Sequence, residues 1–362
     1  MRTLDLRTLN RTLLSRQFLL ERTTMPVLDV VGRLVALQAQ EPNWAYVGLW
    51  TRAESFRHEQ LTALFHDRSV VRGTMVRRTQ HVAAAADFSW LRPTVQPIVG
   101  SALTHAYYAD ETSGLDLKEL TAVARESMAR QAHTRSSLGR VLAERFPGRH
   151  GVRMANAVEL LEGVVHPPPN GVWGAWGNRR QTPVALAQDW TGIPMADGPR
   201  PDTMILRYLE SFGPASVPDV QAWSGLTRLR EVVDTLRPRL RVFRTEEGRE
   251  LFDLPDAPVA DPGMPAPVRF LPAFDNAALG HKDRTRIIGD ADRRRISPTA
   301  SLGVPLFLVD GFVHGCWKLA GGELRIEPFR PLSDAQGEAV LGEARLLLDF
   351  VGPAAATDAV IR

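Results

Sequence analysis

The sequence predicts an α+β fold made of three tandem winged helix-turn-helix modules and a C-terminal β-rich domain. Three observations support this prediction. Residues 202–253 show the order helix, helix, helix, hairpin; two looser versions of this order precede it; and short strand-like runs replace the helical pattern after residue 267. We therefore expect modules at 1–113, 114–198 and 199–258, and the β-rich domain at 266–362.

The module at 199–258 gives the strongest local signal. Apolar residues recur at helical spacing in a first helix over 202–212, which Asp202 can cap. A short second helix (219–223) and a third (227–236) follow, ended by a glycine and a proline. Two strand-like runs, 240–244 and 249–253, then meet at a turn. This is the element order of a winged helix-turn-helix, whose third helix typically enters the DNA major groove.

Weaker patterns of the same kind occupy the first two modules. In the second module they predict helices at 117–130, 136–146 and 152–161, a strand at 163–166 and a hairpin around 167–176. In the first module they predict helices at 27–37 and 58–65, and a hairpin of 70–75 with 77–83.

The chain beyond residue 267 has a different pattern. It predicts strands at 270–272, 306–309, 312–319 and 322–328 and a closing helix at 333–350. Segments rich in Pro, Gly, Ala and Asp at 194–201 and 255–267 indicate linkers.

Composition excludes several classes of protein. With 44% hydrophobic and 23% charged residues, the 362-residue chain has the make-up of a globular protein. It lacks a secretory signal and any apolar run of the roughly 20 residues that a membrane helix needs, so we expect no membrane partner. A single cysteine, Cys316, excludes an internal disulfide and fits a reducing cytoplasm. The net charge of +3 and a pI near 9.3 permit a polyanionic partner, and a DNA-binding protein would associate with the nucleoid.

Common catalytic motifs are absent from the sequence. It contains no phosphate-binding P-loop, no dinucleotide fingerprint and no histidine pair at zinc-site spacing, so we expect neither a cofactor nor a metal. Cys316 lies beside Trp317 and is expected to be a small buried hydrophobe. Polar amides, isolated carboxylates and arginines remain as candidates.

The segment Gln38-Ala39-Gln40-Glu41-Pro42 is the least ordinary stretch of the chain. Pro42 biases Glu41 toward an extended conformation, so the preceding helix should stop near residue 37. In an extended segment the side chains of Gln38 and Gln40 lie on one face, whereas on a helix they diverge by about 200°. From spacing alone, a polar helix end with two solvated amides is the favoured interpretation.

Several residue blocks, in order, resemble one family. The blocks are 34–40 with 45–50, 72–75 with 78–82, 212–215 with 219, 223, 225 and 226, 271–276 with 281 and 284, and 309–311 with 315 and 317. Together they resemble the bacterial winged-helix DNA glycosylases typified by AlkZ (azinomycin resistance) and YcaQ. The resemblance extends from about residue 10 to 350, nearly the whole chain.

The resemblance implies a fold, an activity and a catalytic pair. It implies three winged-helix modules and a β-rich C-terminal part around a concave DNA-binding surface. It implies a monofunctional DNA glycosylase that excises N-alkylated purines and unhooks interstrand crosslinks or bulky adducts in base excision repair or antibiotic self-resistance. It assigns catalysis to Gln38 and Gln40; some members have an acid at the second position, and Gln40 matches the crosslink-resistance branch.

Basic residues in two segments are the candidate DNA ligands. Arg77, Arg78 and His81 belong to the hairpin expected near the site, and a second charged run holds His281, Lys282, Arg284 and Arg286. Solvated surface charges are the simpler interpretation of both.

Other polar and aromatic residues are weaker candidates. Asp275 and Asp283 are the two carboxylates with a possible auxiliary electrostatic role. Trp44 and Trp50 are candidates for stacking on a base, although the apolar surroundings of Trp50 favour the core.

Two other functions use the same architecture. A non-catalytic winged-helix regulator usually has one module per subunit of a dimer, which fits poorly with three modules in one chain. A damage-binding resistance protein would keep the DNA surface without turnover. We expect a monomeric, cytoplasmic enzyme whose partner is duplex DNA with alkylated purines or crosslinks.

Overall fold

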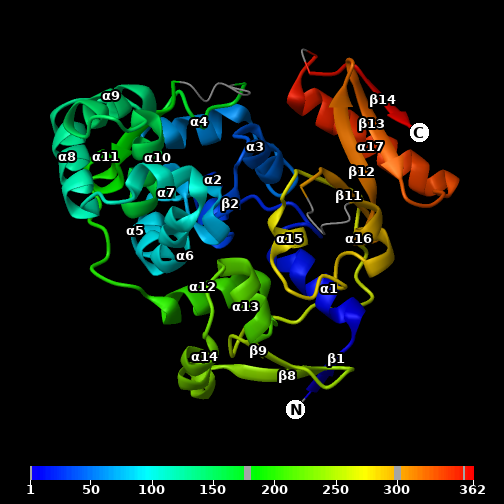
Figure 1. Cartoon of the computed structure of the whole chain (residues 1–362). Helices are drawn as coiled ribbons and strands as arrows, with labels where there is room; N and C mark the ends of the chain where they lie inside the picture. The colour runs from blue at the N-terminus through cyan, green and yellow to red at the C-terminus, as the bar shows by residue number, and fades with distance from the viewer. Residues whose placement is uncertain (1, 175–180, 297–302, 354) are drawn as a thin grey trace.

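The computed structural model describes residues 2–174, 181–296, 303–353 and 355–362. Within these residues the strands form sheets of six, three and five strands, and helices surround them, which confirms the α+β prediction. Figure 1 shows the chain from residue 27 to about 190 on one side, residues 201–253 below it and the C-terminal sheet on the opposite side.

The six-stranded sheet joins the first two expected modules. Its strand order is β2-β4-β3-β6-β7-β5. The strands, in that order, are Leu37–Gln38, Gln80–Ala84, Val70–Thr74, Val164–Val165, Pro183–Leu186 and His133–Thr134. The two halves meet where β3 pairs with β6, at Gly73 and Val165. A Cβ atom on Gly73 would lie 2.9 Å from the carbonyl oxygen of Val164, so this junction requires glycine.

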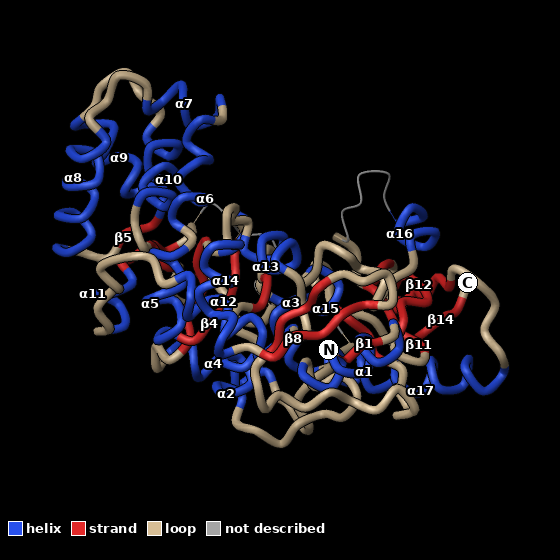
Figure 2. The backbone as a smooth tube through the Cα atoms, turned by 90° about the horizontal axis from the view of Figure 1, so that it is seen from below, coloured by secondary structure: helices blue, strands red, loops and turns tan. Residues whose placement is uncertain are grey.

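Five of the helices around this sheet match predicted ones, at 27–37, 58–65, 117–130, 136–146 and 152–161, and the others were not predicted. Those of the first part are α2 (Val27–Arg33), α3 (Asn43–Trp50), α4 (His58–His66), α5 (Ala85–Thr94), α6 (Gln96–Gly100) and α7 (Ala106–Thr112). Those of the second part are α8 (Leu117–Arg130), α9 (Arg135–Arg145), α10 (Gly151–Leu161) and α11 (Ala187–Thr191). Figure 2 shows α7 to α10 grouped at one end of the molecule.

The structure corrects the hairpin expected around 167–176. The strand β6 pairs instead with β7, which begins at Pro183. Residues 167–169 are three consecutive prolines, which lack the N–H groups that a ladder needs. Residues 175 and 176 lie outside the described part of the chain.

The third unit has the predicted element order. It consists of α12 (Pro201–Phe212), α13 (Val217–Ser224), α14 (Arg230–Leu236) and the antiparallel strands β8 (Arg241–Thr245) and β9 (Glu250–Asp253). Sequence patterns did not predict the third strand of this sheet. It is β1 (Arg2–Leu4), which pairs in parallel with β8.

The C-terminal sheet has the order β10-β11-β12-β13-β14. Its strands are Arg269–Leu271, Leu306–Val309, Phe312–Ala320, Glu323–Pro328 and Asp358–Ile361, and the helix α17 (Asp334–Val351) follows β13. The indole N–H of the buried Trp317 donates to the carbonyls of Leu271 and Leu306, at 2.9 and 3.0 Å. No helix in the described residues is long and apolar enough to cross a membrane.

The helix α1 (Leu6–Arg16) connects the third unit to the C-terminal domain through buried polar side chains. The side-chain amide of Asn10 donates to the carbonyls of Arg286 and Gly311, at 2.7 and 2.8 Å. At its other end, Arg16 forms a buried bidentate pair with Asp253 on β9, with both N–O distances 2.7 Å. Figure 1 shows α1 between these two parts of the chain.

A second buried ion pair fixes Asp275, one of the two carboxylates with an expected electrostatic role. Its two oxygens accept from the two terminal nitrogens of Arg52, at 2.9 and 2.8 Å. Both side chains are at most 1% exposed. Asp275 also caps α15 (Asn276–Leu279) through the N–H of Ala277. Because its carboxylate is enclosed and paired, we assign it a structural role.

We expect Arg52→Met to lower the free energy of unfolding by about 3–5 kcal/mol, because it leaves the Asp275 carboxylate buried without a cation. Urea unfolding measures the change. The matched control is Arg130→Met, which removes a pair with Glu126 that is 75% and 63% exposed and should change stability by less than about 1 kcal/mol. Equal losses in the two variants would contradict the assignment.

Candidate active site

The Gln-Ala-Gln segment leaves the helix earlier than the sequence predicts. The helix α2 ends at Arg33, and Val35 adopts a left-handed conformation with φ of 65°. The strand β2 then pairs Leu37 and Gln38 with Val82 and His81 of β4. Ala39 extends this pairing, since its N–H donates to the carbonyl of Gln80 at 2.8 Å. The predicted extended conformation is therefore present at Gln38 and Ala39.

The two glutamine side chains have different surroundings. Gln38 is 9% exposed, and its Oε1 accepts from Nη2 of Arg77 at 2.9 Å. Gln40 is exposed, and its Oε1 lies 3.3 Å from the backbone N–H of Gln80. Gln40 also lines a cavity of about 340 Å³, whereas Gln38 is not among the residues that line it. That both amides act on one reacting centre stays a prediction.

The turn between β3 and β4 directs Arg77 toward Gln38. Arg77 and Arg78 both have positive φ, of 53° and 62°, in the short helix η1 (Val76–Arg78). This conformation is uncommon for residues other than glycine and costs on the order of 1–3 kcal/mol per residue. Nη1 of Arg77 donates to the carbonyl of Trp223 at 2.8 Å. This hydrogen bond connects the turn to α13 of the third unit. Burial, with a smaller effect of the Arg284 charge, lowers the pKa of Arg77 to about 10, which keeps it protonated near neutral pH.

A second arginine holds the backbone of the same segment. Arg72 on β3 is 6% exposed and donates from Nε to the carbonyl of Ala39 at 2.9 Å, and from Nη2 to the carbonyl of Gln40 at 3.2 Å. Its Nη1 donates to Nδ1 of His166 at 3.0 Å and to Oδ1 of Asn170 at 2.7 Å. The position of the Gln40 backbone thus depends on residues from both halves of the six-stranded sheet.

His166 continues this chain of interactions to a buried carboxylate. Because Nδ1 accepts from Arg72, the proton lies on Nε2, which donates to Oε2 of Glu159 at 3.0 Å. Arg135 binds the same carboxylate in bidentate fashion, at 2.7 and 3.0 Å. Burial lowers the pKa of His166, which keeps it neutral. Burial raises the pKa of Glu159, but His166 and Arg135 outweigh this effect and lower it to about 2.

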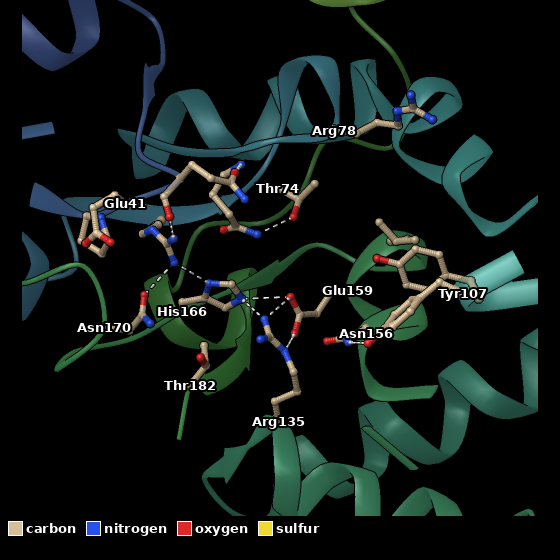
Figure 3. Close-up of a pocket in the computed structure, with 16 residues that line it drawn as sticks. Glu41, Thr74, Arg78, Tyr107, Arg135, Asn156, Glu159, His166, Asn170 and Thr182 are labelled. Atoms are coloured by element: carbon tan, nitrogen blue, oxygen red, sulfur yellow. Dashed lines mark hydrogen bonds and ion pairs between the residues drawn. The ribbon is translucent and has the colours of Figure 1, made fainter. Parts of the chain in front are cut away.

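Figure 3 shows this network as one wall of the cavity that Gln40 lines, with Tyr107 and Asn156 at one end and Glu41 and Asn170 at the other. Sequence patterns did not identify Arg72, Glu159 or His166 as site residues. Arg72 does belong to a block that resembles the glycosylase family, which was the one available signal.

The seven candidate DNA ligands divide by burial. The side chains of His81, His281 and Arg286 are at most 4% exposed, so they have no surface for a phosphate. His281 donates from Nε2 to the carbonyl of Phe212 at 3.0 Å, and Arg286 donates to the carbonyl of Pro214 at 2.9 Å. The sequence-based expectation of a direct DNA contact is therefore corrected for these three residues.

The other four candidates keep accessible surface. Arg78 and Lys282 are exposed, and Arg77 and Arg284 are partly buried. Nη1 of Arg78 lies 3.0 Å from Nε2 of His105, at the start of α7. Contact of these four with DNA stays a proposal.

Of the remaining candidates, Asp283 and Trp50 have structural partners, and Cys316 is a poor nucleophile. Asp283 pairs with Arg249 at 2.7 Å. The ring of Trp50 is buried and stacks on Phe350 at 5.8 Å, as expected for a core residue. Burial raises the pKa of Cys316 to about 11, so a thiolate nucleophile is disfavoured.

Comparisons with known proteins agree with one another. A family model described as DNA glycosylase AlkZ-like matches residues 31–350. An interstrand DNA cross-link repair glycosylase of Streptomyces sahachiroi is 26% identical over 374 residues, with 91% of this chain and 92% of the relative covered. The solved structure of the Streptomyces sahachiroi DNA glycosylase AlkZ matches with a TM-score of 0.81 at 23% identity, covering 99% of this chain and 100% of that one. The structural match shows a common fold.

Two buried histidines make the stability of the protein pH-dependent. Burial lowers the pKa of His81 and of His281 to about 3, with further lowering by Arg77 and Arg286 respectively. Between pH 6.5 and 3 the unfolded chain binds protons at these residues and the folded chain does not, so stability falls as the pH decreases. From pH 6.5 to 5 each histidine should cost about 1–2 kcal/mol.

Urea unfolding at both pH values tests this prediction. The variant His81→Asn should lose less stability over this interval than the unmodified protein, while His66→Asn, at an exposed position, should match the unmodified protein. A pH dependence unchanged in His81→Asn would refute the contribution of His81.

Proposed function

The chain belongs to the AlkZ-like DNA glycosylase family, and from this premise we propose that it hydrolyses the N-glycosidic bond of N-alkylated purines in duplex DNA, including purines joined in interstrand crosslinks. One observation supports the proposal most directly. The segment of Gln38 and Gln40 is held between β4 and the Arg72 side chain, at the edge of a polar cavity.

Two amides suffice for this reaction because of the chemistry of the leaving group. Alkylation at N7 or N3 gives the purine a positive charge, so it departs without further protonation. The enzyme has to stabilise a sugar with oxocarbenium character and to hold a water molecule for attack on C1′. The purine leaves as a neutral base, and the proton that the water loses passes to the solvent. A glutamine carbonyl oxygen can accept a hydrogen bond from that water and direct its dipole at the cation. Neutral, undamaged purines react poorly at such a site, which provides selectivity.

The two glutamines have separate roles in this proposal. Gln40 is exposed at the cavity and is the group that accepts from the attacking water. Gln38 is fixed by Arg77, which uses one lone pair of Oε1 and leaves the other for the reacting centre. Arg72 is a positioning residue, because it binds the backbone of Ala39 and Gln40 and not their amides.

An open surface suits a crosslinked substrate. A base that is tethered to the opposite strand cannot rotate into a closed pocket, so the enzyme has to reach the glycosidic bond within the duplex. The exposed Gln40 meets this requirement. Arg77 and Arg78 at the β3–β4 turn, with Lys282 and Arg284 after α15, are the proposed phosphate ligands.

Replacing either glutamine should abolish most base excision. We expect Gln38→Ala and Gln40→Ala each to lower the single-turnover rate by about 10²–10³, as for the loss of one preorganised transition-state contact. The assay measures release of free base from duplex DNA with one N7-methylguanine or one nitrogen-mustard crosslink. The exposed Gln131→Ala is the matched control and should keep the full rate. Specific DNA binding with the modified base left intact would refute the enzyme and favour a regulator or a damage-binding protein.

Lys282 and Arg284 should contribute to DNA binding and not to chemistry. We expect Lys282→Ala and Arg284→Ala each to weaken binding of any duplex sequence and to reduce the slope of log K against log[salt] by about 1. Fluorescence anisotropy at several salt concentrations measures both effects. Lys118→Ala, which removes an exposed lysine on α8, is the control. A salt slope unchanged by both test variants would exclude this phosphate surface.

A further inference from the structure

The cavity beside Gln40 is larger than a small alkyl lesion requires. Its volume of about 340 Å³ is in the range of pockets that enclose ligand-sized groups. It extends from Gln40 to α7 of the first part of the chain and α10 of the second part, where Tyr107 and Asn156 line it. Figure 3 shows these two residues at the end away from Glu41.

The far wall of the cavity contains an aromatic ring, that of Tyr107, which is not part of the hydrophobic core. Tyr107 is 46% exposed, and its helix α7 has no buried residue. The ring is nevertheless held in place: Tyr108 contacts it edge-on at 4.9 Å, and the guanidinium of Arg153 lies 5.1 Å from its centroid. An exposed ring fixed by its neighbours is a suitable platform for a planar group, because aromatic stacking gains energy without a large loss of side-chain freedom.

The polar groups around this ring fit an uncharged ligand. The hydroxyl of Tyr107 accepts from Nδ2 of Asn156 at 2.9 Å and keeps its own proton for donation. In the charged wall, both oxygens of Glu159 are bound by Arg135 and His166. Since the charges of this wall are compensated within the protein, the wall favours amides, carbonyls and hydroxyls over a phosphate or a cation, and the proposed phosphate ligand of the cavity lining is Arg78.

We propose that this cavity binds the planar, uncharged appendage of a bulky N7 adduct, with the appendage stacked on Tyr107, while the glycosidic bond lies at Gln40. The proposal rests on the proposed function and names its substrate class. N7 of a purine faces the major groove, so a substituent there points away from the sugar. An appendage can therefore extend past Gln40 toward α7 while C1′ stays at the two amides.

Two matched substrates test the proposal. One duplex contains a single N7-methylguanine and the other a single N7-(4-carbamoylbenzyl)guanine, whose ring and amide provide the planar, uncharged group. We expect Tyr107→Ala to slow single-turnover excision of the carbamoylbenzyl adduct about ten-fold, in line with the loss of one stacking contact. Excision of N7-methylguanine should change less than about two-fold. Tyr107→Phe keeps the ring and should stay within about three-fold of the unmodified protein on both substrates.

Three outcomes would overturn the proposal. An equal loss on both substrates would show that Tyr107 acts on the purine or on the fold, and no loss on either would show that the adduct does not reach this ring. A reduction in Leu346→Ala, which removes an exposed residue of α17, equal to that in Tyr107→Ala would show that the effect is not local.

A direct binding measurement separates this proposal from the proposed function. Free N7-(4-carbamoylbenzyl)guanine should bind the unmodified protein in isothermal titration calorimetry, with about ten-fold weaker binding to Tyr107→Ala. If the protein excises neither base but binds this ligand through Tyr107, the proposed reaction fails and the site remains. If it excises N7-methylguanine but binds the ligand equally in both variants, the site fails and the reaction remains.

Discussion

The buried guanidinium of Arg72 is the interaction on which the arrangement of the site depends. A buried cation is tolerated in a protein only where its N–H groups are matched by acceptors. Here the acceptors are two carbonyls of the Gln-Ala-Gln segment and two side chains from the other half of the sheet, His166 and Asn170. The need to satisfy this one cation therefore sets the backbone of Gln40, although the Gln40 side chain itself is exposed. Without β6 packed on β3, those partners would be missing.

The positive charges near the two glutamines pose an electrostatic problem for the proposed reaction. A sugar with oxocarbenium character is destabilised by neighbouring cations. Arg77 binds the side-chain amide of Gln38, and Arg72 binds the backbone carbonyl of Gln40. The charge of Arg72 is partly balanced by Glu159, which stays ionised and is linked to it through His166. Arg77 has no such carboxylate among its described hydrogen-bond partners, so a phosphate of bound DNA is the natural counter-charge. Substrate binding would then supply part of the field that the chemistry requires.

Local signals in the sequence predicted the elements with strong periodicity, missed several helices such as α1 and α5, and could not predict long-range pairing. The helix at 117–130 has the predicted bounds because its start is capped by Asp116 and its apolar residues follow the helical period. The break before Gln38 was predicted from Pro42, but the helix ends four residues earlier than expected, at a left-handed Val35 that no local rule favours. His166 lies 94 positions from Arg72, and the strand β8 lies 241 positions from its partner β1, so no pattern within one segment contains these contacts.

For the candidate site, too, local signals in the sequence were informative and contacts between distant segments could not be predicted. Chemistry and resemblance pointed to Gln38 and Gln40, whereas the basic residues were chosen by charge and, for the run at 281–286, by the same resemblance. Charge does not report burial, and His81, His281 and Arg286 were therefore misjudged as direct ligands.

The pairing of β1 with β8 joins two segments that are synthesised at different times. Arg2 to Leu4 leave the ribosome before their partners, Phe243 to Thr245, which follow some 241 residues later in the chain. At ordinary synthesis rates of 5–20 residues per second, the N-terminal strand waits roughly 10–50 seconds for its neighbour. During that interval the β1 segment has no partner strand in the nascent chain. Cellular factors that bind nascent polypeptides would then have to protect it.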